Sequence, residues 1–227
     1  MTIITSNVLF SIHPKWTYKI LIGTKLIEIR KRIPKVKLPF TAYIYCTLDK
    51  KFPLSLGPFG PGMIEDNDSE YNMQGKVVGE FTCPEILEFT WDDYNHCYDI
   101  DDDSLAKSKL TQEELYNYGK GVTLYGIVIS NVITYDKPRD LDDVRVSCPN
   151  YSDDANVLEC WDCPHFCHYI EPDWSDEYKF CMVDGDKPLT HPPQSWQYVK
   201  EVKDPNEFQR NYTDDPELQR VIEELFS

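Results

Sequence analysis

The chain has 227 residues, of which 41% are hydrophobic, and its formal net charge is −16. This length suffices for one generous domain, or for a domain with a sizeable insertion, and the hydrophobic fraction can build a core. No apolar run reaches the roughly 18 residues of a transmembrane helix, and the N-terminus lacks the pattern of a secretory signal. We therefore expect a non-secreted, cytoplasmic protein without a membrane-spanning segment.

The charge is unevenly distributed along the chain. Of the 23 Lys and Arg and the 39 acidic residues in total, residues 1–57 carry ten of the basic residues and two of the acidic ones. A basic segment in an acidic chain suits local contact with phosphates, while the acidic remainder lowers non-specific affinity for nucleic acid. The simpler interpretation of the acidic remainder is a role in solubility alone, and binding of a basic protein partner is a further alternative.

The first elements expected are a strand, a helix and a second strand within residues 8–30. Pro14 suits the first turn of a helix, because its missing N–H would be unpaired there, and Gly23 supplies the left-handed residue that ends it. Residues 26–30 then alternate with the period of a half-buried strand. This alternation places Glu28 and Arg30 on the same face of the strand.

The rest of the chain predicts mainly short strands. We expect strands at 41–48, 76–83, 123–135 and 192–199, with a long loop at 53–75. Thr111 and Glu114 form a capping-box pattern that predicts a helix start, the acidic run at 99–103 is expected to be a solvated segment, and residues 214–227 predict a C-terminal helix. Many strands with few helices favour a small mixed barrel of α+β type.

Residues 11–34 resemble the opening of the ASCH domain, a family of PUA-like β-barrels. That opening is a helix ending in Gly followed by Gly-x-Lys-x-x-Glu-x-Arg, here supplied by Gly23, Lys25, Glu28 and Arg30. Later segments resemble the family in the same order, at residues 76–81, 123–141 and 191–199. The resemblance implies an α+β fold with a PUA-like mixed β-barrel, flanking helices and RNA binding.

The resemblance also implies an enzymatic alternative. Some small bacterial members of the family are amidohydrolases that act on N4-acetylcytidine and share a Lys-x-x-Thr pair. Lys25 matches the lysine, and Glu28 stands where the threonine would be, so Lys25 and Glu28 are the candidate catalytic residues for an N4-acylated cytidine. A lysine beside a carboxylate normally stays protonated, and burial would be needed to lower its pKa into the range of a nucleophile.

The residues that predict ligand binding come from the basic N-terminal segment. Arg and Lys bind phosphates, a carboxylate accepts hydrogen bonds from a base, and an indole provides a stacking surface. On this basis we expect an RNA or nucleotide-type ligand to be bound by Trp16, Lys25, Glu28, Arg30, Lys31 and Arg32. In a structural alternative, Glu28 and Arg30 pair with each other or with neighbours and stabilise the barrel.

The eight cysteines fall into two groups. Cys46, Cys83 and Cys97 are dispersed and are expected to be buried thiols. The C-x2-C pair Cys160 and Cys163 is followed by two further cysteines, and the set predicts a structural zinc site; its members are Cys160, Cys163, Cys167 and Cys181.

Other readings of the cysteine-rich segment stay open. The alternative zinc ligands are Cys148, His165 and His168, and reduced thiols or a disulfide are further alternatives. These features divide the chain into a barrel at 1–147, a Cys-rich acidic insertion at 148–186 and a closing strand and helix at 187–227. The insertion also raises the alternative that the protein is an interaction module.

Overall fold

The computed structural model describes residues 7–57, 59–62, 71–144, 166–170, 177–181, 191–199 and 209–210. The helices in these ranges are α1 (Pro14–Leu21), α2 (Asp102–Ser108) and α3 (Gln112–Gly119), with a 3-10 turn, η1 (Leu141–Asp143). None of the helices in the described ranges is long and apolar enough to cross a membrane.

Most strands belong to two separate sheets. The larger sheet has six strands, in the order β14 (Trp196–Val199), β1 (Asn7–Ile12), β3 (Phe40–Cys46), β6 (Lys76–Cys83), β11 (Ser130–Arg139) and β15 (Gln209–Arg210). Within it β1 and β3 run parallel, and the other neighbours are antiparallel. The smaller antiparallel sheet has three strands, in the order β2 (Ile27–Arg30), β10 (Leu124–Val128) and β7 (Ile86–Phe89).

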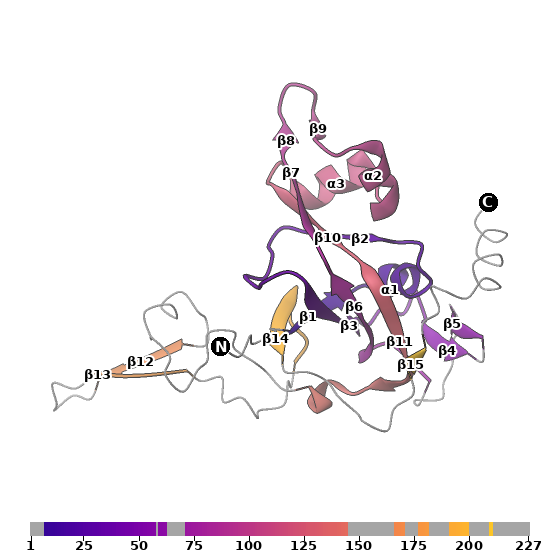
Figure 1. Cartoon of the computed structure of the whole chain (residues 1–227), viewed down its shortest axis with the longest axis vertical. Helices are drawn as coiled ribbons and strands as arrows, with labels where there is room; N and C mark the ends of the chain where they lie inside the picture. Colours follow the sequence, from indigo (N-terminus) through magenta and orange to yellow (C-terminus); the bar gives the residue numbers. More distant parts are fainter. Residues whose placement is uncertain are drawn as a thin grey trace.

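Three short hairpins complete the described strands. They are β4 (Ser55–Gly57) with β5 (Gly60–Gly62), β8 (Trp91–Asp92) with β9 (Cys97–Tyr98), and β12 (Phe166–Ile170) with β13 (Glu177–Cys181). The first of these hairpins lies inside the segment expected to be a long loop. In Figure 1 the three-stranded sheet, α2, α3 and the β8–β9 hairpin form the upper part of the molecule, and the six-stranded sheet forms the lower part.

The predicted mixed α+β class with a sheet core is confirmed, but the expected barrel is not closed. Among the described strands, no pairing joins the two edges of the six-stranded sheet. The single strand expected at 123–135 is in fact two strands, β10 and β11, which belong to different sheets. The break lies at Ile129, and Asn131 beside it has a left-handed φ of 48° next to a register shift against β6. Such a bulge bends a strand, and here it lies at the start of β11, just after the chain leaves β10.

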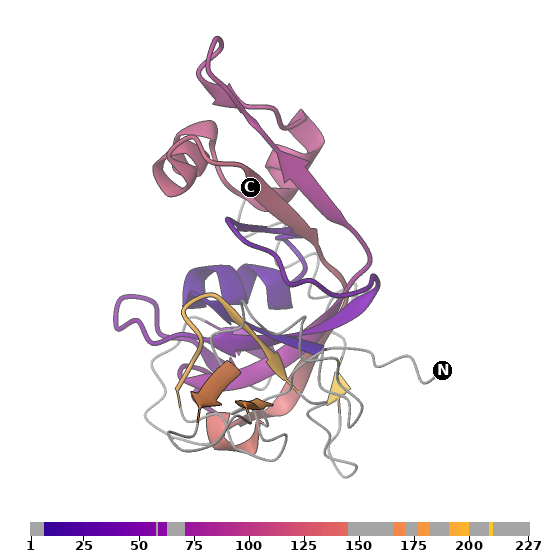
Figure 2. The same ribbon diagram turned by 90° about the vertical axis from the view of Figure 1, so that its left-hand side faces the viewer.

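Helix α1 lies between the two sheets, as Figure 2 shows. It begins at Pro14 and buries Thr17, Ile20 and Leu21 against the six-stranded sheet, while Gly23 follows its end with a φ of 74°. The prediction for this segment is therefore confirmed, including the strand β2 that follows. A second apolar cluster packs α2 and α3 on the other face of β2 and β10, so the three-stranded sheet is covered on that side.

The acidic region before α3 is more ordered than the sequence suggests. The expected solvated segment at 99–103 contains the start of α2, where the Asp101 side chain caps the helix by accepting from the Ser104 N–H at 2.8 Å. Asp102 and Asp103 occupy the first turn, where the helix dipole favours negative charge. The capping box at Thr111 is present as predicted and begins α3.

Only some of the cysteines and histidines named in the predictions lie among the described residues. Cys46 and Cys83 are buried free thiols as expected, and Cys97 is half-buried. Cys167 and His168 lie in strand β12 and Cys181 in β13, whereas Cys148, Cys160, Cys163 and His165 lie outside the described residues. The helix expected at 214–227 also lies outside them.

Candidate functional site

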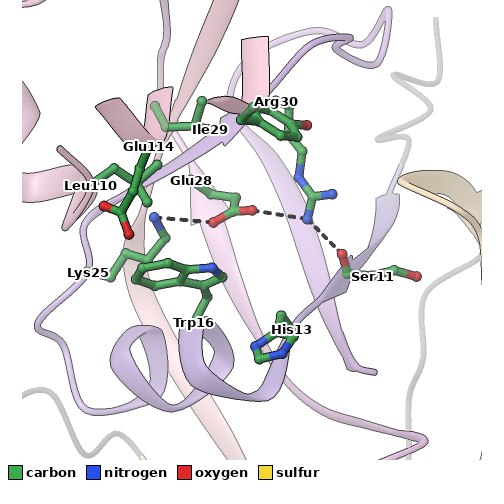
Figure 3. A pocket seen from close by; sticks show the side chains of 10 residues that line it. Ser11, His13, Trp16, Lys25, Glu28, Ile29, Arg30, Leu110 and Glu114 are labelled. Carbon is green, nitrogen blue, oxygen red and sulfur yellow. Dashed lines mark hydrogen bonds and ion pairs between the residues drawn. The ribbon is translucent and has the colours of Figure 1, made fainter. Parts of the chain in front are cut away.

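A cluster of buried charged side chains lies where β2 meets α1 (Figure 3). We call Lys25, Glu28 and Arg30 the charge triad. Lys25 Nζ lies 3.5 Å from Glu28 Oε2, and Arg30 Nη2 lies 3.1 Å from Glu28 Oε1. Their exposed fractions are 1%, 7% and 8%, so one carboxylate is held between two cations away from bulk water.

Lys25 is held at the turn between α1 and β2. Its backbone N–H donates to the carbonyl of Lys19, and its Nζ donates to the carbonyl of Ser108 in α2 at 2.6 Å. The ammonium also lies 4.9 Å from the centre of the Trp16 ring. Burial lowers the pKa of Lys25, and the neighbouring Glu28 carboxylate partly opposes this shift.

Arg30 connects three parts of the chain. Its Nη2 donates to the carbonyl of Ser11 in β1 at 2.8 Å, and its Nη1 donates to Ser195 Oγ, just before β14, at 3.4 Å. The guanidinium carbon lies 5.4 Å from the Phe10 ring. A planar fork with several donors suits this bridging role, which a lysine could not fill in the same way.

The charge triad lines a pocket of about 270 Å³, hereafter the triad pocket. Strand β2 forms one side, Trp16 of α1 the second, and a face of α3 together with Leu110, two positions before the helix, the third. The lining residues are Ser11, His13, Trp16, Lys25, Glu28, Ile29, Arg30, Leu110, Glu114 and Tyr118. This volume is close to the lower end of the roughly 300–1,000 Å³ typical of small-molecule sites.

Further cations surround the pocket. Lys15 Nζ and Lys19 Nζ lie 4.4 and 5.4 Å from the centre of the Trp16 ring. Lys31 Nζ lies 5.0 Å from the centre of the Tyr118 ring. Burial lowers the pKa of Lys19, and the nearby positive charges of Lys15 and Lys109 lower it further. The neighbouring Glu114 carboxylate, which is exposed and lines the pocket, opposes this shift, so the rim holds three cations and one acid.

The structure brings together four of the six predicted ligand-binding residues. Trp16, Lys25, Glu28 and Arg30 line the triad pocket, whereas Lys31 and Arg32 do not. Lys31 still contacts a lining residue, but Arg32 is exposed and its carbonyl accepts from Trp196 Nε1 at 3.3 Å. The alternative pairing of Glu28 with Arg30 is also present, so the same contacts stabilise the fold and shape the pocket.

Sequence reasoning missed the contribution of α3 to the pocket. Glu114 and Tyr118 are spaced by four residues, which places them on one face of α3, and Leu110 lies just before the N-cap Thr111. Glu114 Oε2 accepts from the Thr111 N–H at 2.9 Å, so it serves as a cap while it lines the pocket. The four-residue spacing was the only local sign of this face, and the tertiary fold is needed to show that it meets β2.

His13 is fixed at the edge of the pocket. Its Nδ1 accepts from the Lys15 N–H at 3.2 Å and so caps α1, and its Nε2 lies 2.7 Å from Asp49 Oδ2. Because Nδ1 accepts, the proton between His13 and Asp49 lies on Nε2, from which it is donated to the carboxylate. His13 therefore positions the start of α1 and the wall that carries Trp16.

The described residues contain no group of three or more His, Cys, Asp or Glu side chains that could hold a metal ion. The predicted zinc ligands are not among the residues whose side chains the structure describes, so the zinc site stays a prediction.

The triad pocket itself supplies a carboxylate acceptor, ammonium and guanidinium donors and an aromatic wall. Each Glu28 oxygen contacts one cation and keeps acceptor capacity for a further donor.

Comparison with known proteins gives matches among solved structures. No family model matches the chain, and no curated protein matches it. The crystal structure of ASCH from Zymomonas mobilis matches with 14% identity and a TM-score of 0.42, covering 97% of this chain and 96% of that one. A serine-to-alanine variant of that protein matches with 14% identity and a TM-score of 0.44, covering 98% of each chain.

A further match is the N-terminal domain of McrB from Staphylothermus marinus, with 10% identity and a TM-score of 0.31, covering 60% of this chain and 77% of that one. The ASCH structures belong to the family that residues 11–34 resemble. The chain is therefore similar to ASCH structures along nearly its whole length.

Proposed function

We propose that the triad pocket binds the nucleobase of an RNA or nucleotide-type ligand. The observation that carries this proposal is the placement of a buried carboxylate beside a half-buried indole in a pocket of about 270 Å³. A plain phosphate site would exclude such a carboxylate, because it repels an anion. A base edge with N–H groups, in contrast, donates to it.

The three walls suit the parts of a nucleotide. Trp16 offers a ring on which a base stacks, and Glu28 accepts from an amino or imino group of the base. Lys15, Lys19 and Lys31 at the rim are placed to attract the phosphates that follow. The base contacts then supply recognition, and the rim supplies affinity that falls with salt.

The test is a fluorescence anisotropy titration of a labelled single-stranded oligoribonucleotide of mixed sequence at low salt. Trp16→Leu removes the stacking ring and is expected to weaken binding about tenfold, the effect of losing one base–aromatic stack. Trp91→Leu is the matched control, because Trp91 is also half-buried but lies in the β8–β9 hairpin. Equal affinities for wild type and Trp16→Leu would contradict the proposal.

A second candidate function is hydrolysis of an N4-acylated cytidine. The observation that favours it is the burial of Lys25, which lowers the pKa of its ammonium and so favours the neutral, nucleophilic amine. In this reaction water is added, the amide C–N bond breaks, and cytidine and a carboxylic acid are released. Chromatography of acylated nucleosides incubated with wild type and Lys25→Met tests it; no product from wild type would exclude it.

We also propose that Cys160, Cys163, Cys167 and Cys181 hold a structural zinc ion that orders the acidic insertion. Four thiolates complete the tetrahedral coordination that zinc prefers and leave no position for a substrate. Elemental analysis of the purified chain is expected to find about one zinc per chain. Cys160→Ser and Cys163→Ser are expected to lose it, and a metal-free wild type would contradict the site.

A further inference from the structure

A second cavity lies beside the triad pocket and has no role in the function proposed above. It is a groove of about 560 Å³ between residues 33–38, which connect β2 to β3, and the outer part of the three-stranded sheet. The sheet contributes Ile86, Glu88 and Tyr125 to this groove. Its walls are largely aliphatic, and Tyr125 is the aromatic residue among those that line it.

The strand pairing relates the groove to the triad pocket, because a residue that lines one is opposed to a residue that lines the other. Arg30 of β2 pairs with Tyr125 of β10, and Tyr125 pairs with Glu88 of β7. Directly opposed residues of antiparallel strands project from the same face, with Cβ atoms about 4.5–5.5 Å apart. Tyr125 therefore stands next to Arg30 on the face that carries the charge triad.

The charge around the groove points to an anionic occupant. We define the basic loop as residues 31–37; its cations are Lys31, Arg32, Lys35 and Lys37. All four side chains are exposed, and the loop contains no acidic residue. Glu88, which is also exposed, is the acidic residue that lines the groove. Lys31, the first cation of this loop, also contacts Tyr118, which lines the triad pocket.

The loop is held in place before any ligand arrives. The backbone N–H of Lys35 donates to the Tyr198 hydroxyl at 2.9 Å, and the carbonyl of Arg32 accepts from Trp196 Nε1 at 3.3 Å. Both partners belong to β14, which pairs with β1 of the large sheet. A fixed wall lowers the entropic cost of binding, so the groove is preorganised rather than formed by its ligand.

We propose that this groove binds the nucleotides that flank the base held in the triad pocket, so that the protein engages single-stranded RNA over several nucleotides. Tyr125 provides the stacking surface for a flanking base, the aliphatic side chains contact its sugar and ring, and Lys35 and Lys37 contact phosphates. This inference rests on the function proposed for the pocket, and it adds the class of ligand: an extended single strand rather than a mononucleotide.

The experiment compares labelled single-stranded oligoribonucleotides of roughly two and roughly eight nucleotides by fluorescence anisotropy. Wild type is expected to bind the longer strand at least about tenfold more tightly. Tyr125→Thr and the double variant Lys35→Gln/Lys37→Gln should lose most of that gain while binding the short strand as wild type does. The double variant should also reduce the salt slope by about 0.7 for each phosphate that the two lysines no longer neutralise.

Matched controls are Tyr94→Thr, at an exposed tyrosine, and Lys107→Gln/Lys120→Gln, which removes the same charge from α2 and the end of α3. The double variants alter solvent-accessible lysines, so they keep the test valid even if Tyr125→Thr does not fold. If the groove variants bind both strands as wild type does while Trp16→Leu weakens both, the groove proposal is overturned and the pocket stands. If wild type binds neither the short nor the long strand, the pocket proposal and the groove proposal are both overturned. If an acidic peptide displaces the long strand, the groove is a peptide site and the groove proposal is overturned.

Discussion

The charge triad and the basic loop are consecutive along the chain, yet their charges behave in opposite ways. In the triad, Lys25, Glu28 and Arg30 are buried, and both cations contact the Glu28 carboxylate. In the basic loop, which begins at Lys31, all four cations are exposed to solvent. Within a few residues the chain therefore passes from buried charged side chains, which stabilise the fold, to exposed charged side chains, which can contact a ligand.

This difference predicts how each region responds to mutation. Removing one member of a buried group leaves its partners charged and uncompensated, which costs several kcal/mol. Removing an exposed charge costs little, since water already solvates it and salt screens it. Substitutions in the triad should therefore lower the free energy of unfolding, whereas substitutions in the basic loop should mainly lower the salt-dependent affinity for a ligand.

The largest effect is expected for Glu28→Gln. This change leaves the two buried cations, Lys25 and Arg30, without the carboxylate that both contact, and it should lower the free energy of unfolding by about 3–5 kcal/mol. Urea denaturation followed by circular dichroism measures it. Lys25→Met added to Glu28→Gln removes one of the uncompensated cations and should recover part of the loss. A loss below about 1 kcal/mol for the single change would show that the triad is better solvated than its burial indicates.

Arg30→Lys is expected to have the next largest effect. It keeps the charge beside Glu28 but cannot also reach the Ser11 carbonyl and Ser195 Oγ, so it should cost about 1.5–3 kcal/mol. The same denaturation experiment applies. Arg32→Lys is the matched control, because the Arg32 side chain is exposed, and it should leave stability unchanged. Equal stabilities of the two variants would contradict the bridging role of Arg30.

The lowered pKa of Lys25 predicts a pH dependence of stability. In the unfolded chain the amine keeps its ordinary pKa of 10.5, so between the lowered folded pKa and 10.5 the unfolded state binds more protons. The contribution of Lys25 to stability therefore rises with pH through this window and is lost as pH falls to the folded pKa.

The difference in unfolding free energy between wild type and Lys25→Met isolates this contribution. It should shift in favour of wild type as pH rises through that window, by at most about 1.4 kcal/mol per pH unit. Taking the difference matters because burial raises the pKa of other groups, such as the Cys83 thiol to about 11, and these oppose the trend in wild type alone. A difference that does not vary with pH would mean that Lys25 titrates as an exposed lysine.

The smallest effect on stability is expected in the basic loop. Lys35→Gln and Lys37→Gln should each change the free energy of unfolding by less than about 0.5 kcal/mol, because the side chains are exposed. Binding of a single-stranded oligoribonucleotide should nevertheless weaken, and more so at low salt than at high salt. If either lysine variant lost as much stability as Glu28→Gln, the distinction between buried charges that stabilise the fold and exposed charges that bind a ligand would be contradicted.

Local patterns predicted much of the fold and part of the site. Strand alternation placed Glu28 and Arg30 on one face, and the Thr111 capping box located α3, since both depend on nearby residues alone. The contacts that bury Lys25 could not be predicted, because its partner Ser108 is 83 positions away. The separation of β10 from β11 was missed for a similar reason, as the bend at Ile129 depends on which sheet each half joins.

The most direct test of base binding in the triad pocket is a calorimetric titration that separates base recognition from phosphate binding. Nucleosides, which carry no phosphate, and inorganic pyrophosphate, which carries no base, are titrated separately into wild type and Trp16→Leu. We expect at least one nucleoside to bind wild type with little dependence on salt and Trp16→Leu to weaken it, whereas pyrophosphate binds weakly and similarly to both. Tight pyrophosphate binding without any nucleoside binding would contradict the proposed role of the triad pocket.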